Sequence, residues 1–168
     1  MTEITLATPN DYKQIADLGF IIWNEHYTPI IGAEQVAYML DKFQSEKAIH
    51  QQVKEGFEYY LITFETVPVG YICIKKKRDA LFLSKIYVLS NYRGKKIGKT
   101  AMQFVERRAN TLHCNSIELT VNKYNVNSIK AYEKLGFKTV EALVMDIGNG
   151  FVMDDYRMVK KLKNNSFF

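Results

Sequence analysis

The spacing of apolar residues changes clearly near the middle of the chain. The run 81–88 is short and rich in aliphatic and aromatic residues, which is typical of a buried strand. From Ile97 the apolar residues instead fall at 97, 101, 104, 105 and 109, along one face of a helix. The loop and the helix start hold two glycines and four basic residues, Arg93, Gly94, Lys95, Lys96, Gly98 and Lys99. Because the first turn of a helix leaves its backbone N–H groups unpaired at the positive end of the dipole, this stretch predicts an anion site suited to phosphate.

The same periodicities predict the other elements. Strands are expected at 3–7, 57–64, 69–75 and 116–121, and helices from Thr8 toward Pro29, over 36–43 and 45–55, and from an Asn/Ser cap near 125–128 to Gly136. The first helix is expected to bury Ile15, Leu18 and Ile22, and the last one Ile129, Tyr132 and Leu135. The strand, helix, strand, helix order after residue 80 predicts a parallel crossover, whose strand ends open toward one crevice. Residues 164–168 are expected to form a frayed tail.

Length and composition are those of a single domain, expected to cover residues 1–168. The chain has 168 residues, of which 47% are hydrophobic and 13% aromatic, enough for a packed core. The N-terminus lacks a basic region followed by an apolar one, and no long apolar run occurs, so we expect no membrane span and a cytoplasmic location. Cys73 and Cys114 lack the spacing of metal ligands, which favours buried reduced thiols and no metal site.

Charge is divided unevenly along the chain. Residues 1–65 carry a net charge of −6 and residues 66–168 a net charge of +11, which together give +5. A chance distribution of solvated charges would also explain this division. A polyphosphate cofactor on the basic part and a cationic substrate near the acidic part would explain both signs. No recognition helix, zinc-finger spacing or aromatic RNA-binding motif is recognised, so a nucleic-acid partner is not expected.

Two phosphate-binding motifs compete for the loop. A Walker A loop ends in Gly-Lys-Thr, as residues 98–100 do, but it requires glycine at position 93, where this chain has arginine. The alternative is the Arg/Gln-x-x-Gly-x-Gly/Ala loop of the GNAT acetyltransferases, the acetyl-CoA-dependent N-acetyltransferases. The residues that resemble it are Val88, Tyr92, Arg93, Gly94, Ile97 and Gly98. Lys96 stands where the first glycine of that loop is usual, which leaves open how closely the backbone wraps a pyrophosphate.

A second motif follows at the distance expected in that family. It resembles the pattern Asn-x-x-Ala/Ser-x-x-x-Tyr-x-Lys-x-Gly-Phe, through Asn125, Ser128, Tyr132, Lys134, Gly136 and Phe137. The resemblance covers residues 4–162 and is nearest to bacterial polyamine and other small-amine acetyltransferases. It implies an α/β (α+β) GNAT fold, with a mixed central sheet of about seven strands and four to five helices. It also implies acetyl-CoA between splayed strands four and five, and it allows a homodimer.

Site residues follow from the same resemblance. Tyr132 is expected to act as general acid on the leaving thiolate, and Asn125 to cap its helix and hold pantetheine or substrate. The expected cofactor-binding residues are Ile86, Tyr87, Val88, Arg93, Gly94, Lys95, Lys96, Ile97, Gly98, Lys99, Thr100, Asn125, Ser128, Tyr132 and Lys134. Packing or capping alone would also explain Tyr132 and Asn125.

The acceptor is expected to be a primary amine on a small cationic molecule such as a polyamine. Its expected contacts are Trp23, Glu25, His26, Tyr27, Asp154 and Asp155, which combine carboxylates with aromatic faces. The general base stays open among Glu25, His26, Asp154 and Asp155, while core packing would explain Trp23 and a structural role His26. A protein N-terminus, an amino acid and an aminoglycoside are alternative acceptors. A catalytically silent acyl-CoA-binding or sensing module is the alternative from another functional class.

Overall fold

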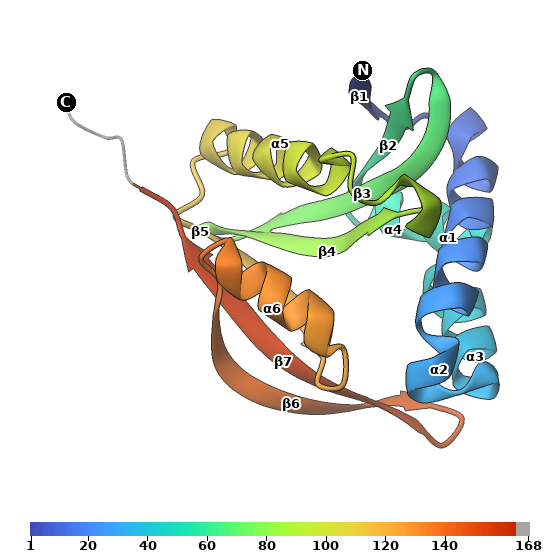
Figure 1. The fold of residues 1–168 in the computed structure, drawn as a ribbon. Coiled ribbons are helices and arrows are strands. Elements are labelled where there is room, and N and C mark those ends of the chain that lie inside the picture. Colours follow the sequence, from blue (N-terminus) through green and yellow to red (C-terminus); the bar gives the residue numbers. More distant parts are fainter. Residues whose placement is uncertain (164–168) are drawn as a thin grey trace. The chain divides into compact units, whose positions relative to one another are not determined.

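The computed structural model describes residues 1–163, so the expected tail at 164–168 lies outside the described residues (Figure 1). Seven strands form one mixed sheet in the order β1-β2-β3-β4-β5-β7-β6. They are β1 (Thr2–Leu6), β2 (Glu58–Phe64), β3 (Val67–Lys77), β4 (Ala80–Val88), β5 (Ser116–Asn122), β6 (Lys138–Gly148) and β7 (Phe151–Lys161). Strands β4 and β5 pair in parallel over only three residues, 80–82 with 116–118, whereas β1–β2, β2–β3, β5–β7 and β6–β7 are antiparallel. The expected mixed sheet is confirmed.

Six α-helices accompany the sheet in the described residues, one more than the upper expectation. They are α1 (Tyr12–His26), α2 (Thr28–Ile31), α3 (Ala33–Phe43), α4 (Glu46–Lys54), α5 (Ile97–Thr111) and α6 (Val126–Lys134). The additional helix is α2, a single turn in which Pro29 takes the second position. Proline is tolerated there because the N–H groups of a first helical turn have no partner within the helix. The first helix ends at His26, before Pro29, as expected, whereas the short helix that contains Pro29 was not expected.

The described chain divides into two compact units, and the expectation of one domain stays a prediction. The first unit comprises residues 1–75 and 84–105, and the second comprises residues 76–83 and 106–163. In the first unit, α1 packs its apolar face on α4, β2 and β3, and Ile15, Leu18 and Ile22 are buried as expected. Cys73 lies in this core and Cys114 in the second unit, and both are buried free thiols, also as expected.

A buried lysine joins α3 and α4 to the sheet of the first unit. Lys85 on β4 is 5% exposed and donates hydrogen bonds to the carbonyl of Phe43, to Oε1 of Gln52 at 3.1 Å and to the hydroxyl of Tyr59. Phe43 is the last residue of α3, and its carbonyl also accepts from the Gln52 amide at 3.1 Å. Burial lowers the pKa of Lys85 to about 8. The lysine therefore occupies the helix C-terminus as a hydrogen-bonded structural cation.

The second unit consists of the strands β5, β7 and β6, helix α6 and the end of α5. Ile117, Leu119 and Val121 alternate along β5 and are buried. The β6–β7 hairpin, orange to red in Figure 1, contains register shifts at 139/141 and 146/148. Unlike the expectation, Ile129 and Tyr132 of α6 are only half-buried and Leu135 is exposed, since the apolar side of this short helix is not fully covered.

The close approach of β3 to the end of β4 generates a stability prediction. A Cβ at Gly70 would lie 2.1 Å from the carbonyl oxygen of Tyr87, so Gly70→Ala must shift backbone rather than a flexible side chain. We expect this variant to lose about 1–3 kcal/mol of unfolding free energy in urea denaturation. The control is Gly98→Ala in α5, where a Cβ meets no atom within 4 Å, and the change from glycine is worth at most about 1 kcal/mol of helix stabilisation. Equal urea midpoints for Gly70→Ala and the parent would contradict this account.

Candidate active site

The loop that enters α5 lies in the first unit and has the backbone shape of an anion site. After Val88 the chain forms a 3₁₀ turn over Ser90–Tyr92, and α5 begins at Ile97, which is 2% exposed and anchors the helix. Two residues between them have left-handed backbone, Gly94 at φ +83° and Lys96 at φ +62°. Lys96 thus adopts the conformation for which glycine is favoured, although it carries a side chain.

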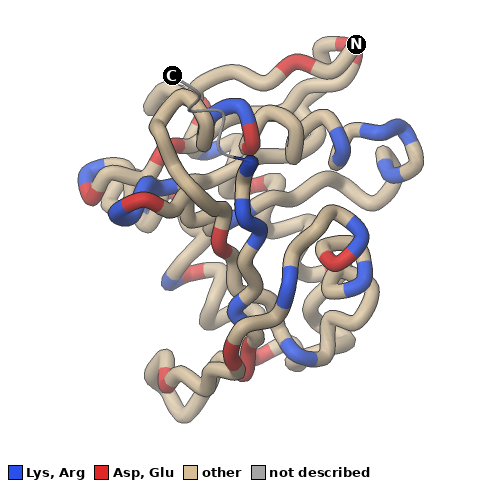
Figure 2. Tube along the Cα trace, turned by 90° about the vertical axis from the view of Figure 1, so that its left-hand side faces the viewer, with Lys and Arg blue, Asp and Glu red and all other residues tan. Residues whose placement is uncertain are grey.

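Four cations surround this loop. Arg93, Lys95, Lys96 and Lys99 are all exposed, and none forms an ion pair with a carboxylate in the part of the chain that the structure describes. Figure 2 marks the charged positions along the trace, with Lys and Arg in blue. Open space lies where a Cβ of Gly98 would project. The first turn of α5 therefore combines accessible backbone donors, dipole and uncompensated positive charge.

The residues expected around the acetyl group lie at the end of β4. Ile86, Tyr87 and Val88 are half-buried, and the backbone of Tyr87 and Val88 passes close to Gly70. The next residue, Leu89, donates its N–H to the carbonyl of Val69 at 2.8 Å. The sequence did not indicate that Gly70 positions the end of β4. Its contact with the backbone of Tyr87 joins two different strands, and the glycine alone marks it in the sequence.

Four of the expected acceptor residues end helix α1. Trp23 is 5% exposed, and its ring lies 4.4 Å from that of Tyr27 and 6.0 Å from that of Tyr87. Glu25 accepts a hydrogen bond from the hydroxyl of Ser90 at 2.9 Å. A cavity of about 220 Å³ is lined by Ile22, Glu25, His26, Ser90 and Arg93. The first unit therefore brings Glu25 and His26 beside the anion loop, while Trp23 is a packed aromatic residue.

The second unit holds the tyrosine motif. Asn125 stands at the N-cap position of α6 and is 4% exposed, but its side chain makes no capping hydrogen bond, so the expectation that it caps the helix is wrong. Its backbone N–H donates instead to the carbonyl of Asn122 at 3.0 Å, which already fixes the entry to the helix. The ring of Tyr132 meets Phe137 edge-on at 5.7 Å. Ser128 is half-buried and Lys134 is exposed. The helix stops before Gly136, at φ +99°, as expected.

Asp154 and Asp155 are neighbours on β7 with different surroundings. Asp154 forms an ion pair with Lys123 at 2.8 Å, and its side chain is 29% exposed. Asp155 is 6% exposed, and burial raises its pKa to about 6, with a further contribution from Asp154. Both residues lie within a strand that pairs on both sides, so neither belongs to a turn.

No group of histidine, cysteine, aspartate and glutamate side chains in residues 1–163 could hold a metal ion. None of the helices in the same residues is long and apolar enough to cross a membrane.

Comparison with known proteins identifies relatives along nearly the whole chain. A spermidine N(1)-acetyltransferase of Thermoplasma acidophilum is 22% identical over 157 residues, covering 90% of this chain and 95% of that protein. The crystal structure of the PaiA N-acetyltransferase from Thermoplasma acidophilum in complex with coenzyme A superposes with a TM-score of 0.79 and 21% identity, covering 96% of this chain and 99% of the other. A GCN5-related N-acetyltransferase from Rhodopseudomonas palustris gives 0.81 and 18% identity, with 96% of each chain covered. The model of the acetyltransferase (GNAT) family matches residues 19–137, so this chain belongs to that family.

Proposed function

We propose that this chain transfers the acetyl group of acetyl-CoA to a primary amine of a small cationic molecule such as a polyamine. The observation that carries the proposal is the entry to α5 in a chain of the GNAT family. Left-handed backbone, the N–H groups of the first helical turn and four basic side chains that form no ion pair within residues 1–163 converge there. Such a site suits a pyrophosphate. The relative that is a spermidine N(1)-acetyltransferase supports the polyamine as acceptor.

The coenzyme would be held by elements of both motifs. Residues 93–100 would bind the pyrophosphate through backbone N–H groups and basic side chains. The backbone of residues 86–88 would lie along pantetheine, with the N–H near Val88 facing the thioester carbonyl. Asn125, Ser128, Tyr132 and Lys134 would contact the coenzyme from the second motif. Ile97 is buried, so its role is to anchor the helix that presents the donors.

Direct acetyl transfer then places two demands on side chains. The neutral amine attacks the thioester carbonyl, the nitrogen releases one proton to water, and the carbon–sulfur bond breaks. The departing thiolate takes a proton that Tyr132 would supply and would regain from water. An alkylammonium with a pKa of about 10.4 is neutral in fewer than about one molecule per thousand at pH 7. The site must therefore bind the amine where losing its proton is favoured. Glu25 and His26 line a cavity beside the loop, where the carboxylate of Glu25 would attract a cation and the charge of Arg93 would oppose it.

The first test concerns the anion loop. Gly98→Asp should weaken CoA binding by more than tenfold, about 1.4 kcal/mol, because it adds a negative charge at the first turn of α5. No atom lies within 4 Å of the added Cβ, so the fold should persist. Titration calorimetry with CoA measures the affinity. Asn110→Asp, which adds the same charge at the exposed far end of the helix, is the control. A folded Gly98→Asp variant with parental affinity would place the coenzyme elsewhere.

The second test concerns Tyr132. Tyr132→Phe should lower kcat by about 100-fold or more and leave the Kd for CoA within about twofold, because only the transferable proton is lost. Tyr124→Phe is the matched control, since Tyr124 is 67% exposed. Unaltered turnover in Tyr132→Phe would assign the general acid to another group.

The third test is the acceptor screen. Steady thiol release from acetyl-CoA should be faster with spermidine and spermine than with monoamines of similar length, and this advantage should shrink at higher ionic strength. Amino acids and a peptide amine complete the panel. Tight CoA binding without turnover on any amine would favour the silent acyl-CoA-binding module. Equal rates for monoamines and polyamines would reject the cationic acceptor and keep the acetyltransferase.

A further inference from the structure

The two neighbouring aspartates of β7 point to opposite faces of the strand. Successive side chains of a strand alternate, so Asp154 and Asp155 cannot serve the same site equally. The backbone carbonyl of Asp154 accepts a hydrogen bond from the N–H of Lys123 at 3.0 Å, and the carboxylate of Asp154 forms an ion pair with the ammonium of Lys123 at 2.8 Å. Asp155 lies opposite Asn122 of β5 and Leu143 of β6. Within residues 1–163, the carboxylate of Asp155 forms no hydrogen bond or ion pair although the residue is 6% exposed.

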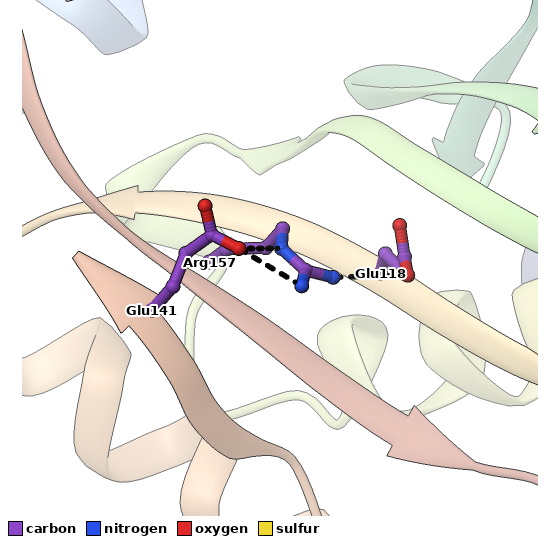
Figure 3. Close-up of polar contacts among 3 residues, drawn as sticks. All are labelled: Glu118, Glu141 and Arg157. Atoms are coloured by element: carbon purple, nitrogen blue, oxygen red, sulfur yellow. Dashed lines mark hydrogen bonds and ion pairs between the residues drawn. The ribbon is translucent and has the colours of Figure 1, made fainter. Parts of the chain in front are cut away.

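The cations nearest to Asp155 in the second unit are already engaged. Arg157 shares its face of β7, two residues further along, and binds Glu118 at 3.1 Å and Glu141 at 3.0 Å, as Figure 3 shows. Lys123 is held by Asp154. Three carboxylates of this region, those of Glu118, Glu141 and Asp154, thus share two basic side chains. Among residues 1–163, Asp155 is the neighbouring carboxylate that forms no ion pair.

Burial without a counterion is unfavourable for a carboxylate. Removal from water and, to a smaller extent, the charge of Asp154 raise the pKa of Asp155 to about 6, although Lys123 acts in the opposite direction. At pH 7 the group is nevertheless about nine-tenths ionised. An ionised carboxylate that is removed from water and has no positive partner costs free energy. A bound cation that forms an ion pair with this carboxylate offsets that cost.

We infer that Asp155, and not Asp154, binds an ammonium group of the acceptor. The inference rests on the proposed function and specifies which carboxylate determines its substrate class. An alkylammonium has three N–H donors, which suit the carboxylate of Asp155. Asn122 lies opposite Asp155 on β5, and its amide oxygen accepts from the N–H of Tyr124 at 2.9 Å, which leaves one lone pair for a further donor. Leu143, on the other side of Asp155, offers an apolar surface to the methylene chain of a polyamine.

The test compares Asp155→Asn with Asp154→Asn in the full chain. Asp155→Asn should raise the KM for spermidine by tenfold or more and change kcat less, whereas Asp154→Asn should raise KM far less. The same Asp155→Asn change should raise the melting temperature at pH 7 by about 2–8 °C, because it removes an unfavourable buried charge. A purely structural aspartate would lower both stability and activity when replaced.

The pH dependence supplies an independent readout. The folded pKa of Asp155 lies above the usual aspartate value of 3.8, so the folded protein binds more protons than the unfolded chain between pH 4 and 6. The contribution of this group to stability therefore falls as pH rises through that window, and this slope should vanish in Asp155→Asn. The KM for spermidine should rise as pH falls below about 6 in the parent only. The titratable groups around Asp155 are Asp154, Lys123, Glu118, Glu141 and Arg157. Asp154→Asn is the control that tests whether the pH dependence arises from Asp154 instead.

Binding measurements separate this inference from the proposed function. Calorimetric titration of spermidine into the CoA-loaded parent and the variants requires no turnover. Loss of spermidine binding in Asp155→Asn alone supports the inference even if the parent acetylates nothing. Parental spermidine affinity in a folded Asp155→Asn variant overturns it, even if acetyl transfer proceeds. Equal losses in the two variants, or a lowered melting temperature for Asp155→Asn, also overturn it.

Discussion

The unpaired backbone donors at the start of α5 are the constraint on which the proposed site depends. A helix cannot satisfy the N–H groups of its own first turn, and here the preceding loop adds cations rather than a capping side chain. Ile97 holds the helix against the core, while Gly94 and Lys96 turn the backbone at φ +83° and φ +62°. The backbone of this loop thereby fixes where negative charge is favourable in the first unit.

Two buried ionisable side chains, Lys85 and Asp155, differ in whether the protein supplies polar partners that offset the cost of their burial. Lys85 is 5% exposed, and its ammonium meets three oxygen acceptors contributed by α3, α4 and β2. Asp155 is 6% exposed and has no such partners among the described residues. Hydrogen bonds within the protein make the lysine part of the framework. Because Asp155 lacks such hydrogen bonds within residues 1–163, we infer that its positive partner comes from a bound ligand.

The sequence allowed β1 to β5, α5 and the stop at Gly136 to be predicted, because each has a local signature. The hairpin of β6 and β7 was not predicted from a local pattern and followed only from the strand number that the family resemblance implied. Apolar periodicity marks strands and helices, and glycine marks left-handed turns. Helix α2 escaped prediction because Pro29 was interpreted as a terminator rather than as a first-turn residue. The different surroundings of Asp154 and Asp155 were also beyond reach. They depend on the register that places Lys123 beside one of them and ties Arg157 to Glu118 and Glu141.

The left-handed lysine of the anion loop has a consequence for product release. A residue with a Cβ held in this conformation costs about 1–2 kcal/mol relative to right-handed backbone, a cost that glycine avoids. In the proposed site, the ammonium of Lys96 would lie near the pyrophosphate and would offset part of this cost. Acetyl-CoA and CoA carry the same pyrophosphate, so this balance would act equally on the binding of acetyl-CoA and on the release of spent CoA and would leave the chemical step unaffected.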